Sequence, residues 1–263
     1  MTKTDKMLSR KDGHLGYIIF NNPERHNAVS LEMWEACGDL INQFEEDKDV
    51  RVVIITGAGD KAFVSGADIS KFEEERSSQA AVERYNKAVD HGYGAVAKFS
   101  KPTIAMIRGY CIGGGMGLAT CCDIRICSDN SKFGVPAAKL GLGYSYPGVK
   151  RLADIVGPSF TKEIFYTARQ FDAEEARVMG LVNRVVPAAQ LETYVRDYAG
   201  MIAGNAPMTV DSIKLITNEI YKDESRRDMK ACDDAVAACF ASNDYKEGRA
   251  AFMAKRKPVF TGS

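Results

Sequence analysis

The chain has 263 residues, of which 45% are hydrophobic and 27% are charged, the composition of a globular protein with a substantial core. Lysine and arginine total 35, and aspartate and glutamate also total 35, so the formal net charge is zero. Because a balanced charge gives no general attraction to nucleic acid or to an anionic membrane, we expect neither as a partner.

Targeting and metal-binding signals are sparse. The first 13 residues are polar and lack the apolar stretch of a signal peptide, and the longest aliphatic run, Val52–Ile55, is too short to cross a bilayer. The seven cysteines lie mostly among apolar residues without Cys-x-x-Cys spacing, which predicts buried, reduced thiols and a cytoplasmic location. His14, His26 and His91 have no partner at ligand spacing, so we expect no metal site.

The N-terminal quarter alternates between strand and helix patterns. Residues 17–20 (YIIF) are typical of a strand, and apolar residues at helical spacing predict an amphipathic helix over 31–47. Residues 52–55 predict a fully buried strand. Residues 61–68 are expected to be a loop with Ser65-Gly66-Ala67 at its tip.

The same alternation continues into the middle of the chain. Helical spacing covers residues 80–99, and Pro102 then begins a strand over 104–107. Gly113-Gly114-Gly115 follows and opens a short helix, and residues 124–126 predict another strand. Strands that alternate with helices favour an α/β architecture.

The C-terminal part is mostly helical from about residue 147. It contains one strand-like segment, residues 181–186, and Pro207 fits the first turn of a further helix. We expect residues 1–200 to form the core domain and residues 201–263 a helical C-terminal region.

Three consecutive glycines between a buried strand and a helix have a high backbone entropy cost. The unpaired N–H groups at the start of a helix, with no Cβ to obstruct them, are typical of a site for an anion or an oxyanion. A tight packing turn between strand and helix explains the glycines equally well. The spacing is not Gly-x-Gly-x-x-Gly, and a Gly-Lys-Ser/Thr sequence is absent, so the dinucleotide-binding and Walker loops are disfavoured.

Residues 104–124 (IAMIRGYCIGGGMGLATCCDI) resemble the signature segment of the enoyl-CoA hydratase/isomerase (crotonase) family. Segments resembling four further landmarks of that family occur in the family's order: NNPERHNAVS, KAFVSGADI, GLVNRVV and DYKEGRAAFMAKRKP. The resemblance covers residues 15–260. It implies a spiral of ββα units with a helical C-terminal region used for trimerisation, and trimers of this family often pair into hexamers. It also implies an acyl-CoA substrate, with CoA as part of the substrate and no separate cofactor.

The resemblance also assigns roles to individual positions. In this family two backbone N–H groups polarise the thioester carbonyl, and in this chain they fall on Ala67 and Gly114. Tyr144 matches the catalytic tyrosine of the methylmalonyl-CoA decarboxylase branch in the segment AKLGLGY. The expected substrate-binding residues are Arg25, His26, Lys61, Ser65, Gly66, Gly113, Ala137, Ser145, Tyr146, Phe252 and Lys255.

The chain departs from the hydratases at their two catalytic glutamates. Gly117 and Ala137 occupy those positions. Because general acid–base catalysis typically contributes about 10²–10⁴-fold per group, we expect the loss of both carboxylates to lower the rate of hydration severely. Asp123 is interpreted as structural, Glu163 as structural or part of an interface, and Asp68 as a residue that caps or braces the Ser65-Gly66-Ala67 loop. The chain does not fully match the decarboxylase branch either, because that branch has a histidine where this chain has Ala67.

These observations favour an acyl-CoA lyase that stabilises a thioester enolate, with decarboxylation of a small malonyl-type thioester as the most specific version. The alternatives are an enoyl-CoA hydratase or isomerase, and a non-catalytic acyl-CoA-binding protein. The RNA-binding side function known in one branch is disfavoured by the neutral charge.

Overall fold

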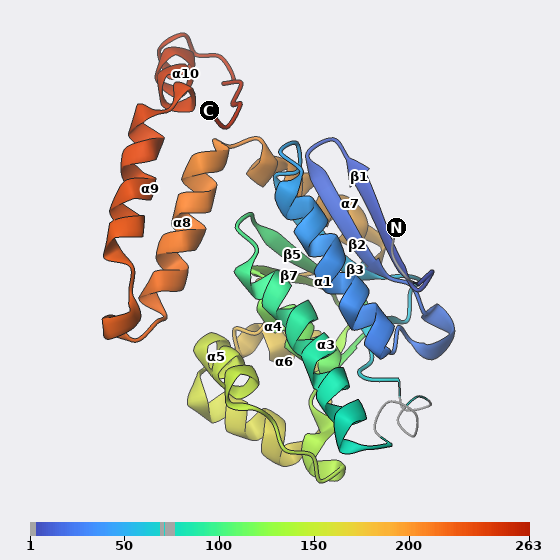
Figure 1. Cartoon of the computed structure of the whole chain (residues 1–263). Coiled ribbons are helices and arrows are strands. Elements are labelled where there is room, and N and C mark those ends of the chain that lie inside the picture. Colours follow the sequence, from blue (N-terminus) through green and yellow to red (C-terminus); the bar gives the residue numbers. More distant parts are fainter. Residues whose placement is uncertain (1–3, 69–70, 72–76) are drawn as a thin grey trace.

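The computed structural model describes residues 4–68, 71 and 77–263. Its strands form two sheets (Figure 1). The larger sheet has the order β1-β2-β3-β5-β7-β10 and is parallel except for the β1–β2 pair. Its strands are β1 (Met7–Asp12), β2 (Leu15–Phe20), β3 (Val52–Gly57), β5 (Thr103–Ile107), β7 (Ile124–Ser128) and β10 (Arg184–Val186).

The smaller sheet has the order β4-β6-β8-β9, and only its β8–β9 pair is antiparallel. Its strands are β4 (Ala62–Val64), β6 (Tyr110–Ile112), β8 (Lys132–Gly134) and β9 (Phe171–Asp172). None of these four short strands was expected from the sequence, and β4 lies inside the segment predicted to be a loop. The N-terminal strand β1 was also missed.

The two sheets are built by the same repeated step. The pairs β3–β4, β5–β6 and β7–β8 each place their first strand in the larger sheet and their second strand in the smaller one. Helices α3 (Gln79–Lys98), α4 (Gly114–Cys121) and α5 (Tyr146–Thr167) follow these pairs in turn, and α5 is kinked at Gly157. This is the spiral of ββα units, so the predicted α/β fold is confirmed.

The core lies on both faces of the larger sheet, because successive side chains of a strand point to opposite faces. In β3, Val53 and Ile55 pack into a cluster with helix α1 (Leu31–Glu46) and α3. Val52 and Ile54 pack on the other face against α7 (Leu191–Ala203). The continuous apolar run at 52–55 therefore indicated a strand buried on both sides, as expected.

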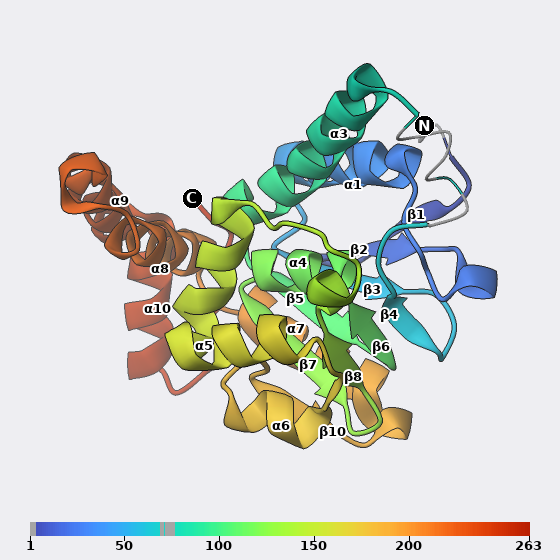
Figure 2. The same cartoon turned by 90° about the horizontal axis from the view of Figure 1, so that it is seen from below.

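Three helices, α8 (Pro207–Ile220), α9 (Met229–Ala241) and α10 (Asn243–Met253), extend away from the sheets (Figures 1 and 2). The short helix α6 (Ala173–Val178) lies between β9 and β10. Among the described residues, no helix combines the length and the apolar character needed to span a bilayer.

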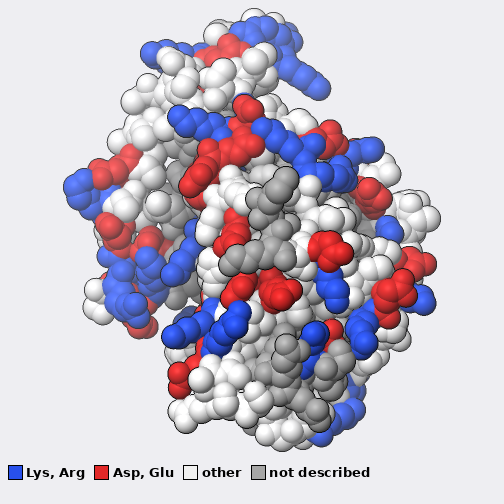
Figure 3. All heavy atoms as spheres, turned by 45° about the vertical axis from the view of Figure 1, so that its right-hand side comes forward, with Lys and Arg blue, Asp and Glu red and all other residues white. Residues whose placement is uncertain are grey.

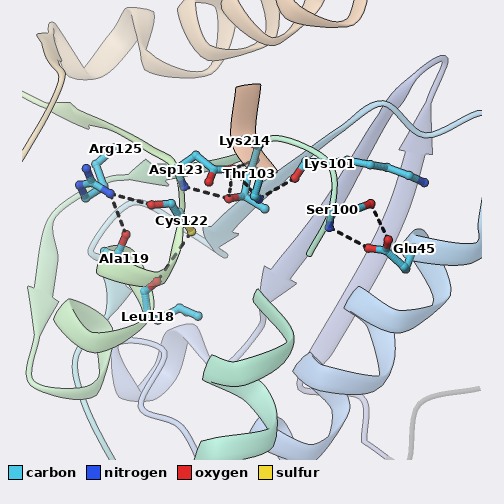
Figure 4. A network of polar contacts seen from close by, with 10 residues as sticks. All are labelled: Glu45, Ser100, Lys101, Thr103, Leu118, Ala119, Cys122, Asp123, Arg125 and Lys214. Carbon is cyan, nitrogen blue, oxygen red and sulfur yellow. Dashed lines mark hydrogen bonds and ion pairs between the residues drawn. The ribbon is translucent and has the colours of Figure 1, made fainter. Parts of the chain in front are cut away.

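The carboxylate of Asp123 connects the C-terminal helices to the core (Figure 4). The Asp123 carboxylate accepts hydrogen bonds from the backbone N–H and the hydroxyl of Thr103, at 2.7 and 2.8 Å. The Lys214 ammonium on α8 donates to the same oxygen at 2.7 Å and to the Lys101 carbonyl at 2.8 Å. These contacts agree with the structural interpretation of Asp123.

Candidate active site

Two loops that are far apart in sequence meet at one edge of the smaller sheet. Strands β4 and β6 are parallel neighbours, so the segments that follow their carboxyl ends, Ser65–Ala67 and Gly113–Gly114, emerge side by side. A Cβ atom placed on Gly114 would lie 3.8 Å from the Gly66 Cα atom, and one placed on Gly113 would lie 3.9 Å from it. The contact between the loops is therefore made by bare backbone.

Both loops present an unpaired backbone N–H group. An isolated bridge joins Val29 to Ala67, in which the Val29 N–H donates to the Gly66 carbonyl (2.9 Å) and the Asp68 N–H donates to the Val29 carbonyl (3.0 Å). This arrangement leaves the Ala67 N–H without an acceptor within the part of the chain that the structure describes. Gly114 is the first residue of α4, so its N–H likewise has no acceptor in its own helix.

The three consecutive glycines have different structural reasons. Gly113 has a φ of 54°, which favours glycine. A Cβ atom on Gly114 would make only ordinary contacts, at 3.5 Å, with Trp34 and Tyr93. A Cβ atom on Gly115 would lie 2.1 Å from the Val64 carbonyl oxygen, so this glycine is required for close packing against β4. The packing explanation thus applies to Gly115, and the unpaired amide belongs to Gly114.

The position of the first hydratase glutamate is closed by a tyrosine from α3. A Cβ atom on Gly117 would lie 2.5 Å from the Tyr93 hydroxyl oxygen. That hydroxyl donates a 2.8 Å hydrogen bond to the Gly114 carbonyl, and its ring packs edge-to-face on Trp34 with centroids 4.8 Å apart. Ala137, at the position of the second glutamate, is buried in a short 3-10 helix. Neither position carries a carboxylate.

Tyr93 was not recognised from the sequence. The sequence indicates only that Tyr93 belongs to an amphipathic helix. Its hydrogen bond to Gly114 on α4 joins residues 21 positions apart, and such a contact leaves no local signal. Burial is the main reason why the pKa of the Tyr93 hydroxyl lies well above its ordinary value, and the neighbouring Cys121 thiol and Tyr144 and Tyr85 phenols raise it further. The hydroxyl therefore stays protonated at neutral pH.

Tyr144 belongs to the same group of phenols. Its ring packs edge-to-face on Phe165 with centroids 4.9 Å apart. The residue is 41% exposed, and burial, with a smaller contribution from Tyr85, raises the pKa of its hydroxyl. The structure thus places Tyr144 near Tyr93.

The two residues after Tyr144 are more peripheral. Ser145 precedes α5 as its N-cap, but its side chain makes no capping hydrogen bond. Tyr146 is the first residue of α5 and is largely exposed. Glu163, farther along α5, forms an ion pair with Arg169 at 3.1 Å, in agreement with a structural role.

The two segments expected to contact CoA form one cavity. Residues 23–27 and 58–62 enclose about 220 Å³, and the lining includes His26 and Lys61. The Ser65 N–H donates to the His26 carbonyl at 3.2 Å, which ties the first segment to the Ala67 loop. Arg25 lies 4.0 Å from the buried carboxylate of Asp68. Arg25 and His26 therefore lie next to the Ala67 loop, and Lys61 lines the same pocket as His26.

Asn27, which the sequence analysis did not single out, holds the two segments together. Its side-chain N–H₂ donates to the carbonyls of Ala58 and Ala62, at 2.9 and 2.7 Å, and its side-chain oxygen accepts from the Asn22 N–H at 2.9 Å. Its φ of 54° is a conformation that asparagine tolerates better than most residues. The residue is fully buried.

Asn27→Ala is therefore expected to lower the free energy of unfolding by roughly 2 kcal/mol or more, because it leaves buried polar groups unpaired. Denaturant unfolding monitored by circular dichroism measures the effect. The matched control is Asn21→Ala, which removes only an exposed hydrogen bond to the Asp5 carbonyl and is expected to have little effect. Equal stability of the two variants would contradict this role of Asn27.

Two predicted substrate-binding residues lie apart from this group. Phe252 and Lys255 are at the end of α10, which stands far from α4 in both ribbon views (Figures 1 and 2). Phe252 is 83% exposed. The structure does not bring these residues to the CoA loops of their own chain, so their predicted contact with CoA would require the CoA of a neighbouring subunit.

The comparisons with known proteins give the family. The model of the enoyl-CoA hydratase/isomerase family matches residues 10–263. A crotonyl-CoA hydratase from Syntrophomonas wolfei is 36% identical over 256 residues, which cover 97% of this chain and 98% of that protein. The carnitinyl-CoA dehydratase of Escherichia coli is 34% identical over 262 residues, covering 96% and 97% respectively.

Solved structures agree with this result. The crystal structure of an enoyl-CoA hydratase/carnithine racemase from Magnetospirillum magneticum superimposes with a TM-score of 0.94 at 35% identity, over 99% of this chain and 97% of that one. An enoyl-CoA hydratase from Bacillus anthracis gives a TM-score of 0.92 at 31% identity, over 98% and 100%. The chain belongs to the enoyl-CoA hydratase/isomerase family.

Proposed function

We propose that this protein is an enzyme that binds an acyl-CoA thioester and stabilises the derived enolate between the N–H groups of Ala67 and Gly114. The convergence of these two unpaired amides at the edge of the smaller sheet carries the proposal. Fixed donors aimed at a developing negative charge are an effective form of catalysis, and each contributes about 3 kcal/mol to transition-state stabilisation. The missing Cβ atoms of Gly66 and Gly113 leave room for the thioester oxygen.

The relatives favour addition or removal of water as the reaction. The names of those compared above are crotonyl-CoA hydratase, carnitinyl-CoA dehydratase and enoyl-CoA hydratase. An enoyl-CoA hydratase or isomerase is therefore the reaction class with the stronger support from similarity. The site lacks the two expected carboxylates at Gly117 and Ala137, so water must be activated by another group if this chain performs that reaction.

The absence of a carboxylate at Gly117 and Ala137 favours decarboxylation as the second candidate reaction. A malonyl-type substrate needs no protein base: the bond between its α-carbon and its carboxylate breaks, CO₂ leaves, and the electron pair becomes the enolate held by Ala67 and Gly114. The α-carbon then takes a proton. Tyr144, in the group of phenols near Gly117, is proposed to orient the departing carboxylate.

A turnover screen read by mass spectrometry separates these reactions. Short acyl-CoA thioesters are supplied in parallel, with crotonyl-CoA and methylmalonyl-CoA at the head of the panel. Gain of water identifies a hydratase, and loss of CO₂ identifies a decarboxylase. We expect conversion of at least one thioester. Binding of the panel without any conversion would contradict the enzymatic proposal and favour a non-catalytic acyl-CoA-binding protein.

Lys61 is proposed to contact the CoA phosphates from the cavity between residues 23–27 and 58–62. Lys61→Ala is expected to raise KM for an acyl-CoA roughly fivefold at low salt, the equivalent of about 1 kcal/mol for a partly exposed ion pair. KM for the corresponding acyl-pantetheine, which has no nucleotide, should not change. The control is Lys48→Ala, because Lys48 precedes β3 and Lys61 follows it, so the two lysines lie at opposite ends of that strand. An equal effect on both thioesters would exclude the phosphate contact.

We further propose a homotrimer or a hexamer of two trimers. Large apolar side chains are exposed on the C-terminal helices, including Ile213, Ile220, Phe240, Phe252 and Met253, and burial between subunits would remove them from water. Nucleic acid and membrane are not proposed as partners. On the face drawn in Figure 3, basic and acidic side chains are interspersed rather than gathered by sign. A cytoplasmic location stays a prediction from the cysteine content.

A further inference from the structure

We propose that Tyr93 is the proton donor of this site and delivers a proton to the α-carbon of the bound enolate. The inference rests on the proposed function, because it requires an enolate at Ala67 and Gly114. Both candidate reactions produce that enolate, and both leave its α-carbon in need of a proton. The two positions that hold carboxylates in the hydratases have none here, so another group has to supply it.

The position of the Tyr93 hydroxyl fits this role. It hydrogen-bonds to the Gly114 carbonyl at 2.8 Å and lies 3.5 Å from the point where a Cβ atom of Gly114 would stand. It also lies 2.5 Å from the corresponding point on Gly117, so it fills the space through which a glutamate at that position would extend. A donor at this place is adjacent to the residue whose N–H holds the thioester oxygen.

The surroundings of Tyr93 keep it in the acidic form. Burial and the neighbouring Cys121, Tyr144 and Tyr85 raise the pKa of its hydroxyl, so the proton is present throughout the neutral range. In the proposed step the hydroxyl rotates away from the Gly114 carbonyl. Its O–H bond breaks, a C–H bond forms at the α-carbon, and the enolate returns to a thioester carbonyl. Water then restores the proton to the tyrosinate.

The other protic groups near α4 are less well placed. The Cys121 thiol is directed to the Gly117 carbonyl at 3.2 Å, and burial raises its pKa to about 11. Tyr144 packs on Phe165 and has no hydrogen bond to the glycine segment among the described residues. Tyr93 is the phenol in direct contact with Gly114. Tyr144 therefore keeps its proposed role in orienting the substrate.

The test is the stereochemistry of protonation in D₂O. Crotonyl-CoA and methylmalonyl-CoA are each offered to the protein, and the configuration of deuterium at the α-carbon of the product is measured. We expect a single configuration from the unaltered protein. Tyr93→Phe keeps the ring against Trp34 and removes only the hydroxyl. This variant is expected to lose about 10²-fold in turnover and to give both configurations, because bulk water protonates the enolate.

Two controls separate proton donation from a structural effect. Tyr17→Phe alters a buried tyrosine on the opposite face of the larger sheet and is expected to change neither readout. Binding of [1-¹³C]butyryl-CoA, monitored by the infrared frequency of its thioester carbonyl, should be the same in Tyr93→Phe and in the unaltered protein. A shifted carbonyl frequency with unchanged stereochemistry would show that Tyr93 acts only through Gly114, and would overturn the proposal.

The remaining outcomes are also decisive. Full turnover and a single configuration in Tyr93→Phe would overturn the role of Tyr93 while leaving the proposed enolate intact. Absence of turnover on the whole thioester panel by the unaltered protein would remove the proposed function and, with it, the proton donor. Gly114→Pro tests the enolate separately from Tyr93, because it should lower the turnover of the unaltered protein by about 10²–10³-fold if the enolate is held as proposed, whatever the result for Tyr93→Phe.

Discussion

Gly114→Pro is expected to lower kcat on the true acyl-CoA substrate by about 10²–10³-fold, the usual cost of removing one oxyanion donor. Proline has no N–H, and Gly114 is the first residue of α4, a position where proline fits the helix well. The substitution therefore deletes the donor while the helix is retained. Steady-state kinetics of the variant, with its thermal unfolding measured in parallel, tests this expectation.

Gly114→Ala is the matched control. Its Cβ atom would meet Trp34 and Tyr93 at ordinary van der Waals distances of 3.5 Å, and the N–H would remain. We expect this variant to keep most of its activity. If alanine and proline reduce kcat equally, crowding near Trp34 rather than loss of the N–H limits the reaction, and the proposed role of Gly114 is wrong.

Gly115→Ala is expected to destabilise the fold, although alanine is intrinsically favoured over glycine in a helix by about 1 kcal/mol. Its Cβ atom would lie 2.1 Å from the Val64 carbonyl oxygen. Since that oxygen belongs to the backbone of β4, relief requires a shift of the strand that leads to Ala67. We expect a loss of about 1–3 kcal/mol in the free energy of unfolding, the usual range for overpacking.

Denaturant unfolding of Gly115→Ala beside Gly114→Ala measures the difference between neighbouring glycines. Only the first should be strongly destabilised, because only its new methyl group meets backbone. A stable Gly115→Ala variant with normal activity would show that α4 does not pack on β4 as closely as described. The pair thus tests the packing that sets the position of both loops.

The elements that the sequence predicted well are those with a strong local pattern. The helices over 31–47 and 80–99 were found within one residue of their observed ends, because their apolar residues recur along a long stretch. The buried strand at 52–55 was recognisable from its continuous aliphatic run. The resemblance of residues 104–124 to a family signature then supplied the spiral, which these local patterns alone do not define.

The smaller sheet could not be predicted in the same way. The strands β4, β6 and β8 have three residues each, which is too short for a period of two to be visible. These strands pair only because successive ββα units stack on one another, so that each unit adds one strand to the smaller sheet. This sheet nevertheless sets the site, because its neighbouring strands bring Ala67 to Gly114.

Two important side chains were missed for a related reason. The Tyr93 hydroxyl on α3 donates a hydrogen bond to the Gly114 carbonyl on α4, and Asn27 joins residue 22 to the carbonyls of residues 58 and 62. Such contacts depend on the tertiary arrangement and leave no periodic signal in the sequence. The sequence predicts that Gly117 and Ala137 replace the two glutamates of the hydratases, but only the structure places a tyrosine beside Gly117.

The most direct test of the central claim is the carbonyl stretching frequency of [1-¹³C]butyryl-CoA bound to the protein, measured by difference infrared spectroscopy. This saturated thioester reports polarisation without the need for turnover. We predict a lower frequency for the bound than for the free thioester in the unaltered protein and in Gly114→Ala, and a clearly smaller shift in Gly114→Pro, where only the Ala67 N–H remains. An unshifted carbonyl in the unaltered protein, or an equal shift in the proline variant, would contradict an oxyanion hole formed by Ala67 and Gly114.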